Sequence, residues 1–152
     1  MLKVMFVCLG NICRSPMAEF ILKDMVKKQG IDNKFIINSS ATSFEEVGND
    51  MYVYAKEMLD KKGIKYSKRE ARKLTIDDYN KYDFIIGMDK YNISNIIEFT
   101  NNKEKIYKLL DFTDNPNDII DPWYSRNFEK TYEEIVKGCN GFLKYLKAKG
   151  MI

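Results

Sequence analysis

Short apolar runs alternate with segments of helical periodicity along the chain. Four runs consist mostly of consecutive apolar or β-branched residues, as is typical of strands buried on both faces, and they span residues 3–7, 35–37, 84–86 and 106–110. The segments between them place apolar residues three and four positions apart, as on one face of a helix. Strands that alternate with helices form a parallel sheet with helices on both faces, so the pattern predicts an α/β fold.

Local signals mark where several of these helices begin and end. Ser15 and Pro16 have the pattern of an N-cap followed by proline at the first helical position, and Gly30 ends that helix. Thr75 and Asp78 have the spacing of a capping box, which opens a short helix. The last helix has the clearest apolar face, made of Tyr132, Ile135, Val136, Cys139, Phe142, Leu143 and Leu146.

Length and composition fit one domain. The chain has 152 residues, of which 45% are hydrophobic, so residues 1–152 are expected to form a single domain with its own core. No apolar run approaches the roughly 18 residues that a membrane span needs. The first residues form too short an apolar stretch for a signal peptide, and no small-residue cleavage site follows them. We therefore expect a cytoplasmic protein with no membrane partner.

Charge, cysteine and histidine content narrow the possible chemistry. The formal net charge of +3 suits small anionic ligands better than a nucleic acid, so no nucleic-acid partner is expected. Three cysteines without a secretion signal predict free thiols rather than a disulfide framework. The chain contains no histidine, which excludes Cys-His and Ser-His catalytic pairs and most zinc or copper sites. We expect no metal site, and a nucleophile would need another means of activation.

The loop after the first strand has the features of an anion-binding cradle. Such sheets bind ligands at the carboxyl ends of their strands, and here Cys8 ends the strand while Arg14 lies where the helix begins. The backbone N–H groups of a tight loop converge on one point, and the helix N-terminus adds about half a positive charge. Arg14 supplies a planar fork that matches two oxygens of a phosphate. Gly10 allows the turn, and the Asn11 side chain can hold it by hydrogen bonds.

The same field favours an ionised thiol. A free cysteine is mostly protonated at neutral pH, whereas helix N-termini and cationic neighbours stabilise the thiolate. Cys8 is therefore the candidate nucleophile in a chain without histidine. The alternative is a buried core cysteine beside a surface arginine.

A polar loop from about residue 111 to 127 contains the candidate proton donor. Asp121 precedes Pro122, one of three prolines, and Trp123, the only tryptophan. A carboxylic acid on this stiffened turn could protonate a leaving oxygen while the aromatic rings pack on a phenyl group. The alternative for such a sequence is an ordinary turn.

These motifs together resemble those of the low-molecular-weight protein tyrosine phosphatases. The resemblance rests on residues 7–19 and 121–124, and it extends to residues 39–43, 71–72 and 88–89. It implies a four-stranded parallel sheet of flavodoxin-like winding with strand order 2-1-3-4. It also implies a reaction without metal or cofactor, in two steps through a phosphocysteine.

The resemblance assigns roles to individual residues. Cys8 would be the nucleophile, Arg14 would bind the transferring phosphoryl group, and Asp121 would act first as general acid and then as general base. The phosphate-binding loop would comprise Leu9, Gly10, Asn11, Ile12, Cys13 and Ser15, with hydrogen-bonding support from Asn11, Ser15 and Ser39. In the family the second loop cysteine, here Cys13, can form a reversible disulfide with the nucleophile.

Departures from the family pattern concern the substrate wall, which is expected to comprise Phe44, Glu45, Trp123 and Tyr124. Glu45 stands where an aromatic residue is frequent, and Trp123 stands where tyrosine is usual. Arg69 replaces a histidine that is common in the supporting hydrogen-bond network. An acidic Glu45 near the entrance is expected to disfavour very acidic phosphopeptides.

The expected function is hydrolysis of phosphotyrosine in proteins, or of small aryl phosphates, with inorganic phosphate as product. Two other enzymes on the same fold are alternatives: an arsenate reductase, which needs further cysteines to relay a disulfide, and a phosphoarginine phosphatase, whose members usually have threonine in place of Ile12. A non-catalytic thiol redox or anion-binding module is the third alternative. Asp121 argues against it, because a binding module has no use for a proton donor.

Overall fold

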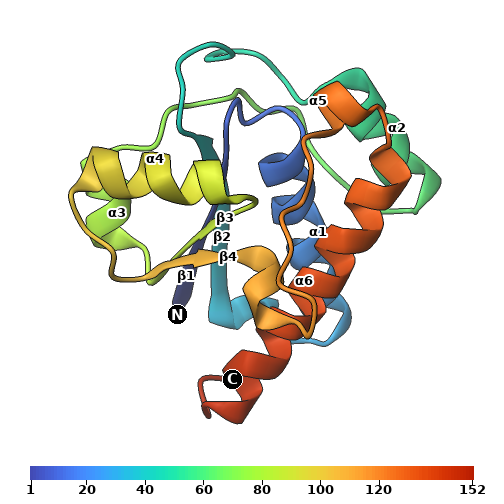
Figure 1. Ribbon diagram of the computed structural model, residues 1–152. Coiled ribbons are helices and arrows are strands. Elements are labelled where there is room, and N and C mark those ends of the chain that lie inside the picture. The colour runs from blue at the N-terminus through green and yellow to red at the C-terminus, as the bar shows by residue number, and fades with distance from the viewer.

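A four-stranded parallel sheet forms the centre of the computed structural model, which describes residues 1–152 (Figure 1). Its strands lie in the order β2-β1-β3-β4, so both the predicted α/β class and the order 2-1-3-4 are confirmed. Their bounds are Leu2–Cys8 for β1, Phe35–Ala41 for β2, Phe84–Gly87 for β3 and Ile106–Lys108 for β4.

Helices cover both faces of this sheet, as Figure 1 shows. One face carries α1 (Arg14–Lys28) and α6 (Phe128–Ala148), and the other carries α3 (Ile76–Lys81) and α4 (Lys90–Thr100). Two further helices, α2 (Val53–Lys61) and α5 (Pro122–Ser125), lie next to each other beyond the carboxyl ends of the strands. No helix of the structure combines the length and the apolarity that crossing a membrane requires.

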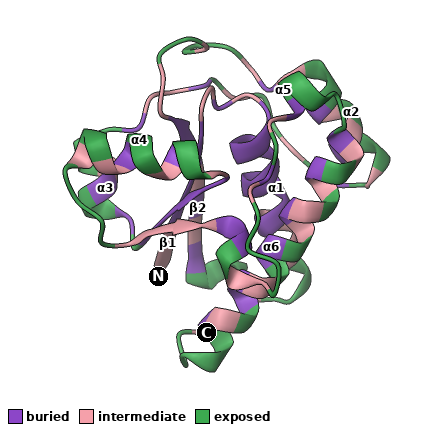
Figure 2. Cartoon of the chain, viewed as in Figure 1, coloured by how far each residue is buried: buried purple, intermediate pink, exposed green.

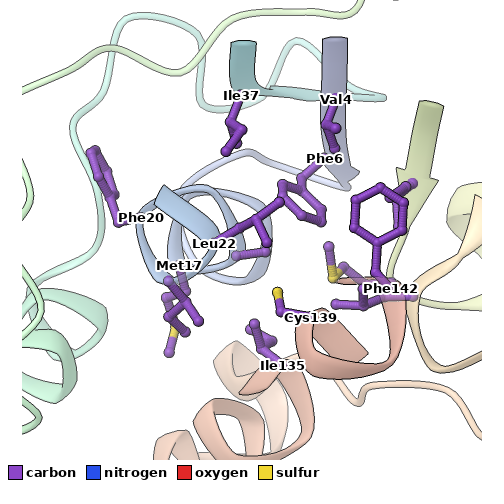
Figure 3. Packing of buried hydrophobic residues seen from close by; sticks show 14 of the residues in the cluster. Val4, Phe6, Met17, Phe20, Leu22, Ile37, Ile135, Cys139 and Phe142 are labelled. Atoms are coloured by element: carbon purple, nitrogen blue, oxygen red, sulfur yellow. The ribbon is translucent and has the colours of Figure 1, made fainter. Parts of the chain in front are cut away.

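The apolar residues of β1 divide between two cores because successive side chains point to opposite faces of a sheet. Val4 and Phe6 pack into the larger core with α1 and α6, whereas Met5 and Val7 belong to the smaller core under α3 and α4. Figure 3 shows the larger core, in which Phe6 and Cys139 lie among side chains of α1 and α6. Buried positions accordingly line the sheet and the inner faces of the helices (Figure 2).

The strand register brings the functional segments to one edge of the sheet. Cys8 at the end of β1 pairs with Ala41 of β2, and Val7 pairs with Gly87 of β3. Because all strands run in parallel, the loops that follow β1, β2 and β3 leave the sheet at the same edge. The candidate loop therefore faces the residues that follow β3.

Three sequence predictions are wrong: the end of β4, the absence of a helix between residues 111 and 127, and the N-cap of α1. β4 ends at Lys108, because the residues after it form a 3₁₀ helix, Leu109–Phe112, that packs on α6. The predicted loop from 111 to 127 also contains the short helix α5.

Ser15 is not the N-cap of α1. That position belongs to Cys13, whose side chain makes no capping bond, while Ser15 lies inside the first turn with its hydroxyl bonded to Asn11 and Cys8. The Ser15 hydroxyl therefore forms hydrogen bonds within the loop and does not cap the helix. The capping box of Thr75 and Asp78 is confirmed.

Gly141 of α6 offers a test of the packing between this helix and the 3₁₀ turn. A Cβ at Gly141 would collide with the carbonyl oxygen of Phe112. Gly141→Ala should therefore destabilise the protein by roughly 1–3 kcal/mol, although alanine has the higher helix propensity. Urea unfolding measures this effect, with Asn140→Ala on the exposed side of the same helix as the control. A Gly141→Ala variant as stable as the wild type would contradict the close packing.

Candidate active site

The candidate loop runs from Cys8, the last residue of β1, to Arg14, the first residue of α1. The Cys8 thiol is 3% exposed. The N–H groups of Gly10, Asn11, Ile12 and Cys13 donate to no acceptor within the protein, whereas loop carbonyls are bonded to the segments after β2. For example, the Leu9 carbonyl accepts bonds from both the N–H and the hydroxyl of Ser43, at 3.1 and 2.9 Å. The loop thus keeps four amide donors available beside the thiol.

Asn11 holds this loop in shape. Its backbone has a φ of 60°, in the left-handed region that asparagine tolerates better than most residues. Its buried side-chain amide donates to the hydroxyls of Ser15 at 2.8 Å and Ser39 at 3.0 Å. Both protons of the amide are therefore used to connect the loop to α1 and β2.

The other side of the Asn11 amide is bound by the segment between α2 and α3. Arg69 Nη2 donates to the Asn11 side-chain oxygen at 2.5 Å and to the Asn11 backbone carbonyl at 2.6 Å. The backbone N–H of Arg72 donates to the same side-chain oxygen at 3.2 Å. Arg69 thus occupies a place in the supporting hydrogen-bond network, as predicted.

A buried carboxylate extends the network into α1. The Ser39 hydroxyl donates to Glu19 at 2.6 Å, and Lys23 one turn further along the helix pairs with the other oxygen of Glu19 at 2.6 Å. The Ser39 proton is therefore committed to Glu19, which leaves its oxygen free to accept the bond from Asn11.

The Cys8 sulfur has a hydrogen-bond donor on its α1 side. Ser15 Oγ lies 3.0 Å from the sulfur, and the Ser15 N–H donates to the sulfur at 3.4 Å. Since the Ser15 oxygen already accepts a proton from Asn11, its own proton has two acceptors within reach, the sulfur at 3.0 Å and the Ser40 carbonyl at 3.4 Å. The hydrogen-bonding groups closest to the sulfur thus come from the first turn of α1.

Arg14 is 2% exposed and fixed by two short bonds. Its Nη1 donates to Asp89 at 2.6 Å and to the backbone carbonyl of Ile119 at 2.8 Å. Burial by itself would lower the pKa of Arg14, but the negative charges of Cys8, Asp89 and Asp121 outweigh it and raise that pKa. The guanidinium is thus permanently charged and held in one orientation.

Asp121 is the N-cap of α5. One of its carboxylate oxygens accepts a bond from the Trp123 N–H at 3.0 Å, and the other lies 3.5 Å from Arg14 Nη2. Pro122 at the first helical position fixes the backbone that follows. The sequence therefore folds this turn so that the carboxylate faces the loop.

A hollow of about 80 Å³ lies where these elements meet. Most of the predicted site residues line it, and its lining comprises Cys8, Leu9, Gly10, Ile12, Cys13, Arg14, Glu45, Glu46, Asp121, Trp123 and Tyr124. Asn11, Ser15 and Ser39 lie behind it as supports, in agreement with the contacts above. Phe44 does not line it: the side chain is 74% exposed and its ring lies 5.5 Å from the Lys73 ammonium.

Tyr52 joins the loop to the aromatic wall. Its backbone N–H donates to the Ile12 carbonyl at 2.9 Å, and its ring centroid lies 4.7 Å from that of Trp123. Arg126 donates to the Tyr52 hydroxyl at 3.0 Å and also lies over the Trp123 ring, 5.2 Å from its centroid. Through its backbone bond to Ile12 and its ring contact with Trp123, Tyr52 joins α5 to the loop.

The other two thiols are buried. Burial, followed by the charges of Cys8 and Asp121, raises the pKa of Cys13, and burial raises that of Cys139. Cys13 lines the hollow together with Cys8, and all three cysteines are free. Cys139 is fully buried in α6, in agreement with its predicted place on the apolar face.

Sequence reasoning missed several partners of the site. Glu46, Glu19 and Tyr52 act through contacts between segments far apart in the chain, for which the sequence pattern carries no signal. Asp89 could have been predicted from the sequence, because it follows β3 at the same sheet edge as Cys8 and precedes a helix as a capping residue would.

The role of Asn11 is testable by two substitutions. Asn11→Gly keeps a residue that accepts a positive φ but removes the side-chain bonds, so it should lower the free energy of unfolding by roughly 2–3 kcal/mol. Asn11→Ala should cost roughly 1 kcal/mol more, because alanine is strained in the left-handed region. Asn101 is the matched control, since it is exposed and also left-handed at φ 52°, with no side-chain bond to lose.

Urea unfolding of the four variants separates the two effects. Asn101→Gly should leave stability within about 0.5 kcal/mol of the wild type, and Asn101→Ala should show only the backbone cost. An Asn11→Gly variant as stable as Asn101→Gly would contradict the supporting role of the Asn11 side chain.

Comparisons with known proteins agree with this geometry. The sequence model described as low molecular weight phosphotyrosine protein phosphatase matches residues 3–151. The low molecular weight protein-tyrosine-phosphatase YfkJ of Bacillus subtilis is 37% identical over 147 residues, which cover 94% of each chain. Its crystal structure superposes with a TM-score of 0.93 at 35% identity, over 98% of this chain and 96% of that one.

Two further similarities come from animals. The low molecular weight phosphotyrosine protein phosphatase of Gallus gallus is 38% identical over 149 residues, 93% of each chain. The crystal structure of a Drosophila arginine phosphatase superposes with a TM-score of 0.90 at 28% identity, over 96% of this chain and 98% of that one. Cys8 and Arg14 fit the phosphate-binding loop motif of the matched family. The chain belongs to the low-molecular-weight protein tyrosine phosphatases, which hydrolyse phosphoric monoesters.

Proposed function

We propose that this phosphatase hydrolyses phosphotyrosine in proteins, and small aryl phosphates, through a phosphocysteine at Cys8 and releases inorganic phosphate. The observation that carries the proposal is that a buried thiol, a loop whose N–H groups have no acceptor within the protein and a fixed guanidinium meet at one hollow. Together these groups complement a phosphoryl group and the negative charge of its transition state.

Binding of the phosphoryl group falls to the loop amides and Arg14. The N–H groups of residues 10–13, which have no acceptor within the protein, are available as donors to the phosphate oxygens, and α1 adds the field of its N-terminus. Arg14 Nη1 is occupied by Asp89 and Ile119, whereas Nε makes no hydrogen bond within the protein and Nη2 has only the ion-pair contact with Asp121 at 3.5 Å. These two nitrogens are available for two phosphate oxygens.

In the first step the Cys8 thiolate attacks phosphorus and the bond from phosphorus to the phenolic oxygen breaks. Asp121, protonated, gives its proton to that oxygen, so tyrosine leaves as a neutral phenol. The Ser15 hydroxyl, 3.0 Å from the sulfur, stabilises the thiolate before attack.

In the second step water replaces the sulfur. Asp121, now ionised, takes a proton from the attacking water, and the bond from sulfur to phosphorus breaks to release phosphate. The Cys8 thiolate forms again, with Ser15 in place to stabilise it as a leaving group. No metal or cofactor takes part in either step of this scheme.

The walls of the hollow fit an aryl ester. Leu9, Ile12, Trp123 and Tyr124 offer apolar surface to a phenyl ring above the loop. Glu45 in the same lining disfavours very acidic phosphopeptides by like-charge repulsion.

The alternatives have less support. An arsenate reductase needs a third thiol that can relay a disulfide outward, but Cys139 is 0% exposed within the core. The bulk of Ile12 in the hollow suits an aryl ester better than phosphoarginine. A binding module would not need Asp121 beside Arg14. Two other expectations stay predictions: the cytoplasmic location and a reversible disulfide between Cys8 and Cys13.

Turnover of p-nitrophenyl phosphate and of phenyl phosphate, in the presence of EDTA, tests the roles of Cys8 and Asp121. Cys8→Ser should lower kcat by a factor of about 10³ or more, because the nucleophile is lost. Asp121→Asn keeps the N-cap and should lower kcat for phenyl phosphate by a factor of about 10²–10⁴. The loss should be smaller for p-nitrophenyl phosphate, whose leaving group needs less protonation.

Asp114→Asn provides the control for Asp121→Asn, because Asp114 is an exposed carboxylate outside the hollow. Its kcat should equal that of the wild type with both esters. Full activity of Cys8→Ser, or equal losses with both esters in Asp121→Asn, would contradict the assigned roles. Faster hydrolysis of phosphoarginine than of phosphotyrosine would favour the arginine phosphatase alternative.

A further inference from the structure

A second hollow, of about 340 Å³, adjoins the candidate active site. The two hollows share Leu9, Arg14, Asp121 and Tyr124 in their linings, so they are continuous along one surface. The second hollow lies between the start of α4 and the segment that leads into α5, which are joined by a bond from the Lys90 N–H to Asp118 at 3.1 Å. These two segments lie side by side in Figure 1.

Exposed apolar side chains form the rim of this second hollow. Tyr91 is 67% exposed, Ile120 is 54% exposed and Tyr124 is 76% exposed, while the fully buried Ile119 contributes to its lining. Large side chains exposed together beside a candidate active site mark a surface that another molecule covers.

The carboxylates in the lining are already paired. Asp89 binds Arg14 at 2.6 Å, and Asp118 binds Lys108 at 3.0 Å in addition to the Lys90 N–H. Asp121 caps α5 and faces Arg14. Each carboxylate of the lining thus already contacts a cation, and the large side chains exposed at the rim are Tyr91, Ile120 and Tyr124.

We propose that this second hollow binds an apolar side chain of the protein substrate, one or two residues from the phosphotyrosine. An extended peptide rises about 3.3 Å per residue, so a neighbour of the phosphotyrosine reaches a hollow that shares four lining residues with the first. The inference rests on the proposed function and names the substrate sequences that the same site prefers: phosphotyrosine with leucine, isoleucine or a similar residue beside it.

Phosphotyrosine peptides that differ at one position test the proposal. Leucine, glycine or lysine is placed one or two residues before or after the phosphotyrosine, and kcat/KM is measured for each peptide and for p-nitrophenyl phosphate. At one of these positions the leucine peptide should exceed the glycine peptide by about tenfold, as expected from burying one aliphatic side chain. The lysine peptide should gain less over glycine than the leucine peptide does.

Substitution of two rim residues tests whether the preference for leucine arises at this hollow. Ile120→Ser and Tyr91→Ser should each remove most of the leucine preference while turnover of p-nitrophenyl phosphate and of the glycine peptide stays at the wild-type level. Ile76→Ser is the matched control, because Ile76 is 45% exposed on α3 and lines neither hollow. It should leave every rate unchanged.

A binding measurement keeps this inference separate from the catalytic scheme. The unreactive Cys8→Ser protein should bind the leucine peptide about tenfold more tightly than the glycine peptide, as measured by fluorescence polarisation. Equal binding and equal kcat/KM of the two peptides would overturn the inference, as would a preference that survives Ile120→Ser and Tyr91→Ser. A leucine preference in binding without any turnover by the wild type would support the second hollow and overturn the proposed function alone.

Discussion

The side chain of Asn11 is the contact on which the site depends. It connects the loop to α1 through Ser15 and to β2 through Ser39, while Arg69 binds the opposite end of its amide. Its left-handed backbone turns the loop so that four N–H groups remain without partners beside the Cys8 thiol. Because these amides have no acceptor within the protein, an anion can bind them without the loss of an internal hydrogen bond.

The fold positions the charged side chains around the loop. A parallel sheet brings the ends of β1 and β3 to one edge, which places Asp89 within 2.6 Å of Arg14. The charge of Asp89 compensates a buried guanidinium that would otherwise be costly to desolvate. Tyr52 then ties α5 to the loop through its contact with Trp123, so Asp121 faces the same point. Residues from four separated segments thus act on one small volume.

Local patterns predicted the parts of this structure that depend on neighbours in sequence. The strands, the capping box at Thr75 and the placement of Cys8 and Arg14 between strand and helix follow from spacing alone. Ser15 resembled an N-cap because a cap and a loop support use the same residue type, and only the position of Asn11 decides between them. Phe44 was assigned to the wall by position, but it is exposed and lies outside the lining of the hollow. The roles of such residues depend on contacts between segments far apart in the chain, which cannot be recognised in a single sequence.

Titration of the ¹⁵N-labelled protein with inorganic phosphate tests the central claim most directly. If the N–H groups of residues 10–13 converge on a phosphoryl site, their amide resonances should move downfield together, with one dissociation constant shared by all four. Amides of the exposed loop around Asp114 should not move. Unchanged resonances for residues 10–13 at saturating phosphate, or shifts confined to exposed lysine-rich segments, would contradict the account.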